Sequence, residues 1–115
     1  MLSDAVAAAL AGQACVVVAD ATVALPDALA SLRSASPCDT VIVLILPDLA
    51  TIDRAMLLAA LGPLAIETAP RRIAAIDVAD GALREHVLAT ARYLASACSI
   101  TGQCLRVNRP ADVGG

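Results

Sequence analysis

The sequence contains no lysine: all eight of its cations are arginines, and they form no basic run. Phenylalanine and tryptophan are also absent, so Tyr93 is the only aromatic residue. Nucleic acid is therefore not expected as a partner, because its binding needs clustered positive charge and, for single strands, aromatic stacking surfaces. The net charge of −3 points the same way. The hydrophobic core has to be built from Val, Leu, Ile and Ala.

Long hydrophobic runs are missing too. The apolar run 41–46 has the length of a buried strand and is far shorter than the roughly 20 residues of a membrane-spanning helix. The uncharged stretch 5–19 is preceded by no Lys or Arg, so it does not have the pattern of a signal peptide. We therefore expect a cytoplasmic protein that does not enter a membrane.

Apolar residues are nevertheless abundant. They make up 59% of the 115 residues, against roughly 45–50% in an average globular domain. A chain of this size forms one domain, and its surplus of apolar side chains should leave apolar surface that a partner covers.

The four cysteines show no C-x-x-C spacing and lie in apolar surroundings at positions 15, 38, 98 and 104. Buried free thiols are the expected outcome, consistent with a reduced compartment. A disulfide or a metal site remains the alternative.

The hydrophobic pattern predicts helices alternating with strands. We expect helices near 2–11, 26–35, 49–61 and 81–98, and strands near 14–19, 40–46, 72–78 and 103–107. Strands separated by helices pair in parallel, and right-handed crossovers would give a three-layer α/β sandwich with about four strands. The predicted domain covers 1–108, and 109–115 is predicted to be a loose tail.

Two local details of this prediction concern helix boundaries. Gly62-Pro63 should end the third helix, whose inner face would carry Leu49, Ile52, Met56 and Ala60. Asp80-Gly81 should open the fourth.

The segment 92–107 carries a family resemblance. It reads R-Y-L-A-S-A-C-S-I-T-G-Q-C-L-R-V and is followed by Gly114-Gly115. It resembles the end of short-chain dehydrogenases/reductases, where F-L-A-S, a short spacer, I-T-G-Q, a few apolar residues and G-G are common. Weaker similarities lie at 20–22, 38–42 and 72–76. The resemblance implies a Rossmann-like sandwich, shortened because family members usually run to about twice this length.

At several positions the sequence departs from the family pattern, and these departures imply that the family's chemistry is missing. Val43-Leu44-Ile45-Leu46 stands where the family has N-N-A-G, and Gly12 is isolated, so no glycine-rich loop can approach a pyrophosphate. Tyr93 is followed four residues later by Ala97, which leaves the family's Tyr-x-x-x-Lys pair incomplete. We expect no catalysis, no catalytic residue and no cofactor; if a nucleotide does bind, Asp20 corresponds to the residue that faces adenine.

Few residues are candidates for other chemistry. Asp20, Asp48, Asp77 and Asp80 follow or end predicted strands, where ligands bind in open α/β sheets, although Asp48, Asp77 and Asp80 can equally cap the helices that follow. His86 has no recognisable partner and is expected at the surface. No metal site is expected, because the acidic residues lack D-x-D spacing.

Two functions remain open. The first is a non-catalytic relative that acts by association, with itself or as an accessory subunit of a full-length reductase or synthase. The family resemblance and the exposed last strand place that contact on 81–98 and 103–107, with the interface residues Leu83, Val87, Tyr93, Leu94, Ile100, Cys104, Leu105 and Val107. The second is a small ligand-binding domain or enzyme that uses the strand-end carboxylates of Asp20, Asp48 and Asp77.

Overall fold

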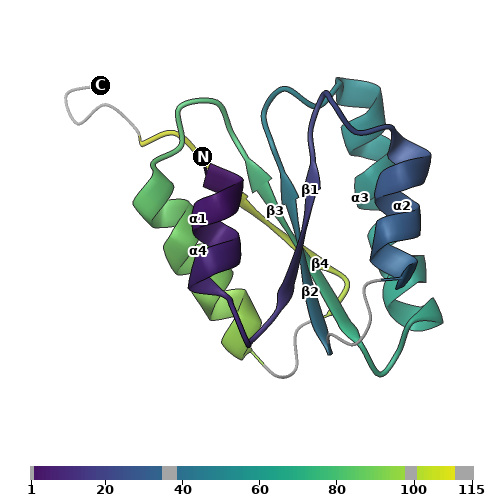
Figure 1. The fold of residues 1–115 in the computed structure, drawn as a ribbon. Coiled ribbons are helices and arrows are strands. Elements are labelled where there is room, and N and C mark those ends of the chain that lie inside the picture. The colour runs from purple at the N-terminus through teal and green to yellow at the C-terminus, as the bar shows by residue number, and fades with distance from the viewer. Residues whose placement is uncertain (1, 35–38, 98–100, 111–115) are drawn as a thin grey trace.

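The computed structural model describes residues 2–34, 39–97 and 101–110, in which helices and strands alternate (Figure 1). The helices are α1 (Leu2–Ala9), α2 (Leu25–Ser34), α3 (Thr51–Glu67) and α4 (Arg84–Ser96). The strands are β1 (Cys15–Ala19), β2 (Thr40–Ile45), β3 (Arg72–Val78) and β4 (Gln103–Val107). The predicted strands are confirmed to within one residue at each end, because each is a short, mainly apolar segment bounded by turn residues.

The strands form one parallel sheet in the order β1-β2-β3-β4. Helices α1 and α4 cover one face of this sheet, and α2 and α3 cover the other (Figure 1). The predicted three-layer, Rossmann-like α/β architecture is therefore confirmed. In the described part of the chain, β1 and β4 are the two edge strands.

One crossover differs from the prediction. Each strand lies beside the one that precedes it in sequence, so right-handed crossovers would place α2, α3 and α4 on the same face. Helices α2 and α3 obey this rule, but α4 packs on the opposite face, and the β3–α4–β4 connection is left-handed (Figure 1). The apolar stripe of Val87, Ala91 and Leu94 packs there beside Val6 and Leu10, in the cluster to which α1 contributes.

The core lies on both sides of β2. All six residues of this strand are buried, with Ile42 and Leu44 facing α1 and α4, and with Val41, Val43 and Ile45 facing α2 and α3. A strand that is buried on both faces reads as an uninterrupted apolar run, which is why it gives the clearest strand signal in the sequence.

Helix α3 is longer than predicted and is turned differently about its axis. It continues through Pro63 to Glu67, because the additional turn buries Leu64 and Ala65 and their packing offsets the hydrogen bond that proline cannot make. With this turn included, Leu57, Leu61 and Leu64 form the inner face. The predicted inner-face residues Ile52 and Met56 are instead 70% and 54% exposed.

Helix α4 begins later than predicted. Gly81 has a φ of 83°, a left-handed conformation that a right-handed helix excludes, so Asp80-Gly81 forms a turn. The amides of His86 and Val87 donate to the carbonyl of Leu83 at 3.1 and 3.2 Å, and Leu83 occupies the N-cap position.

The prediction of free thiols is wrong for Cys15, which is disulfide-bonded, while Cys104 is free and half-buried. Cys38 and Cys98 lie outside the described residues. So does most of the predicted tail, of which Arg109 and Pro110 are exposed and irregular. None of the helices in the described ranges has both the length and the apolar character needed to cross a membrane.

Candidate functional site

The polar feature of the sheet's carboxyl edge is a buried carboxylate. Asp77 is the last but one residue of β3, and strand alternation points its side chain to the α3 face, as it does for Ile73 and Ala75. Its side chain is only 8% exposed. The parallel register aligns Asp77 with Arg106 on β4, and Arg54 approaches from the first turn of α3.

Two arginines share this carboxylate. Arg54 Nη1 donates to Oδ1 of Asp77, and its Nη2 donates to the carbonyl oxygen of Leu46 at 2.9 Å. Arg106 Nη1 donates to Oδ2 of Asp77 at 2.8 Å, and its Nε donates to Oδ1 of Asn108 at 2.8 Å. The three side chains form an Arg54–Asp77–Arg106 cluster that joins α3, β3 and β4.

The two arginines differ in burial. The side chain of Arg54 is 18% exposed, whereas that of Arg106 is 54% exposed. Arg54 is therefore the principal counter-charge of Asp77, because a buried carboxylate needs a partner that is itself shielded from water. Arg106 completes the pairing from the solvent side, where the Coulomb attraction is weaker.

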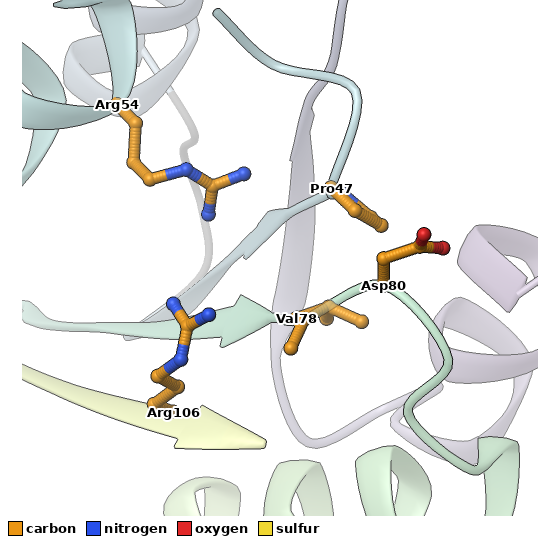
Figure 2. A pocket seen from close by; sticks show the side chains of 6 residues that line it. Pro47, Arg54, Val78, Asp80 and Arg106 are labelled. Carbon is orange, nitrogen blue, oxygen red and sulfur yellow. The ribbon is translucent and has the colours of Figure 1, made fainter. Parts of the chain in front are cut away.

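A pocket of about 260 Å³ opens beside this cluster. It is lined by Pro47, Arg54, Val78, Ala79, Asp80 and Arg106. Figure 2 shows the guanidinium groups of Arg54, which reaches down from α3, and Arg106, which reaches up from β4, turned toward each other, with Pro47, Val78 and Asp80 to one side of both. The carboxylate of Asp80 points away from both guanidinium groups (Figure 2).

Cys104 lies on the same face of β4 as Arg106. Burial raises the pKa of its thiol, and the positive charges of Arg54 and Arg106 oppose that rise without cancelling it. The thiol is therefore protonated near neutral pH, which makes it a poor nucleophile despite the nearby arginines.

The other strand-end carboxylates do not join this cluster. Oδ1 of Asp20 accepts from the amide and hydroxyl of Thr22 at 2.9 and 2.6 Å, which is a local turn. Asp48 is exposed, and no three His, Cys, Asp or Glu side chains in the described ranges come close enough to hold a metal ion. Asp20, Asp48 and Asp77 therefore do not form a metal site in the described part of the chain.

Helix capping does not explain these residues either. The N-cap residue of α3 is Ala50 and that of α4 is Leu83, and neither makes a side-chain capping bond. The capping interpretation is thus wrong for Asp48 and Asp80, while Asp77 is held by its ion pairs. His86 is exposed, as predicted.

The predicted interface residues divide into two groups. Val87, Leu94 and Val107 are buried in the core, so their inclusion in a contact surface is wrong. Leu83, Tyr93 and Leu105 are exposed, at 41%, 56% and 38%, and Cys104 is partly exposed at the β4 edge. Ile100 lies outside the described residues.

A second apolar surface lies on α3. We call it the α3 outer face, and its exposed members are Ile52, Ala55, Met56, Ala59, Gly62, Pro63 and Ile66. Ile66 is 81% exposed, more than any other large apolar residue described. The sequence does indicate an exposed apolar face on this helix. Apolar residues recur at helical spacing along two sides of the segment, and only one side can face the sheet.

Sequence reasoning also missed Arg54 and Arg106. A usable signal was present: Asp77 and Arg106 are the opposite charges within two otherwise apolar strand segments, 73–78 and 104–107. Charges in buried strands are costly unless paired, so each predicts a partner.

Comparison with known proteins identifies a family. A family model described as "SDR-like: Short chain dehydrogenase-like protein" matches residues 4–107. No curated protein and no solved structure matches the chain.

Proposed function

Because this chain belongs to the short-chain dehydrogenase-like family, we propose that it is a non-catalytic member that acts by association. It associates either with a second copy of itself or with a full-length reductase or synthase, to which it would be an accessory subunit. The observation that carries this proposal is the α3 outer face, where Ile52, Met56 and Ile66 are each more than half exposed.

The composition of the α3 outer face suits contact between identical copies. All seven of its members are uncharged, so two such faces meet without repulsion between like charges. The small residues Ala55, Ala59 and Gly62 lie between the larger ones and allow two helices to approach closely. A two-fold axis across this helix would pair the same residues from both copies, as in most homodimers.

The surface on α4 and β4 is the rival location. Leu83, Tyr93 and Leu105 supply apolar area, and β4 is an edge strand whose outer backbone groups can pair with another chain. This surface is the one that the sequence predicts. We place the main contact on α3 because Ile52 and Ile66 are 70% and 81% exposed, more than any large apolar side chain of the rival surface.

Replacing Met56 with glutamate tests the location of the contact. We expect the wild type to have twice the mass of a single chain in light scattering at micromolar concentration. Met56→Glu should weaken association by at least about tenfold, because a dimer would then bury two uncompensated carboxylates. Ala7→Glu adds the same charge at an exposed position of α1 and should leave the mass unchanged.

A different result would relocate or remove the contact. Loss of the dimer in Leu105→Arg but not in Met56→Glu would place it on α4 and β4. A monomeric wild type that also co-purifies with no partner from its native host would contradict association altogether.

The proposal that the chain is non-catalytic predicts that it does not bind NAD(H) or NADP(H). The segment between β1 and α2 is Asp20-Ala21-Thr22-Val23-Ala24, which has no glycine through which backbone amides could reach a pyrophosphate. Calorimetric titration should give only heats of dilution, while a full-length reductase of the family serves as the positive control. Micromolar affinity for either nucleotide would contradict this proposal, and Asp20→Asn would then show whether binding follows the family pattern.

A further inference from the structure

We propose that the pocket between α3, β3 and β4 binds a small oxyanion, a carboxylate or a phosphate group, through Arg54 and Arg106. This site goes beyond association, because it lies at the carboxyl edge of the sheet and uses no residue of the α3 outer face. Ligands of open α/β sheets bind at that edge.

Charge is the first argument. Arg54 and Arg106 carry two positive charges and share the single negative charge of Asp77, so the cluster retains one net positive charge. The protein as a whole has a net charge of −3, which makes this positive charge local to the pocket. Asp80 is the pocket's own carboxylate, but it is exposed and points away from both guanidinium groups (Figure 2). A bound monoanion would balance the cluster.

Unused hydrogen-bond donors are the second argument. A guanidinium group has five N–H donors, and among the described residues Arg54 and Arg106 each use two, toward Asp77, Leu46 and Asn108. Both groups are held in place by these bonds, so their remaining donors are oriented before a ligand arrives. Preorganised guanidinium groups suit the paired oxygen atoms of carboxylate and phosphate.

Size and lining define the ligand class. A volume of about 260 Å³ is below the roughly 300–1,000 Å³ of pockets that hold drug-sized molecules, so it suits a small anion and not a dinucleotide. Pro47 and Val78 form an apolar wall beside the charged groups. The attraction for an anion is stronger at Arg54, which is 18% exposed, than at Arg106, which is 54% exposed.

Titration followed by protein NMR tests this site with two probes, sodium acetate and sodium phosphate, each against sodium chloride at matched ionic strength. We expect saturable shifts at the amides of Ala79, Asp80 and Arg106, with a dissociation constant of the order of 1 mM. The probe that binds more tightly identifies the preferred group. Arg106→Ala should weaken binding at least about tenfold.

Two variants serve as controls. Arg33→Ala removes an arginine that pairs with Glu67 at 2.9 Å in a separate pocket, and it should bind both probes like the wild type. Arg106→Lys keeps the charge and stem but not the fork of donors, so it should bind with intermediate affinity and covers the case in which Arg106→Ala fails to fold. Shifts that do not saturate, or affinity that Arg106→Lys leaves unchanged, would overturn the proposal.

Discussion

Replacing Arg54 with methionine is expected to lower the free energy of unfolding by about 3 kcal/mol, the lower end of the cost of breaking a buried ion pair. The variant leaves Asp77, whose side chain is 8% exposed, with Arg106 as its only arginine partner in the described part of the chain. Arg106 is 54% exposed and compensates the buried charge only in part. Because native domains are stable by only about 5–15 kcal/mol, this loss should be easy to measure by urea unfolding.

Arg106→Met is the matched control for this prediction. It removes the other arginine that pairs with Asp77, the one on the solvent side. We expect it to lower the free energy of unfolding by less than about 1 kcal/mol. The double variant Arg54→Met with Asp77→Leu should recover much of the stability lost in Arg54→Met, because it removes the buried charge together with its partner. Equal costs for Arg54→Met and Arg106→Met would contradict the distinction that burial makes between them. All variants need the same protein concentration, since association contributes to apparent stability.

The cluster shows where prediction from the sequence ends. Arg54, Asp77 and Arg106 are separated by 23 and 29 residues along the chain, and no local pattern connects them. Their meeting depends on β4 lying next to β3 in a register that aligns Asp77 with Arg106. The sequence shows that each strand carries a charge, but the pairing is a property of strand order.

The strands themselves were predictable for a local reason. Each is a short, mainly apolar segment between turn formers, and the segments 40–46 and 72–78 need no tertiary information to be recognised. The handedness of the last crossover was not predictable in this way. Right-handed and left-handed connections use the same helix and the same strands, and they differ only in the face on which α4 packs.

Helix α3 was only partly predictable from the sequence. Its existence follows from its sequence, but its rotation about the axis does not, because apolar residues line two sides of the helix. Ending the segment at Gly62-Pro63 favours the side of Ile52 and Met56, whereas continuing it to Glu67 adds Leu64 to the side of Leu57 and Leu61. The side with Leu57, Leu61 and Leu64 faces the sheet because it buries more apolar surface there.

A pair of alanine substitutions distinguishes these two orientations of α3. Leu57→Ala should lower the free energy of unfolding by about 2–5 kcal/mol, because Leu57 is fully buried and its loss leaves a cavity beneath the helix. Met56→Ala removes a side chain of similar size from the neighbouring position, yet it should cost less than about 0.5 kcal/mol in the monomer, because Met56 is 54% exposed. Urea unfolding at protein concentrations low enough to dissociate any dimer isolates the contribution of the single chain.

The opposite ranking would restore the orientation that the sequence predicts. If Met56→Ala were the costly variant and Leu57→Ala the mild one, Ile52 and Met56 would face the sheet. The α3 outer face would then carry Leu57 and Leu61, and the Met56→Glu association test would report on folding instead of contact. The expected ranking has a further consequence for association. Met56→Ala should then shift the concentration dependence of unfolding, whereas Leu57→Ala should lower stability equally in the monomer and the dimer.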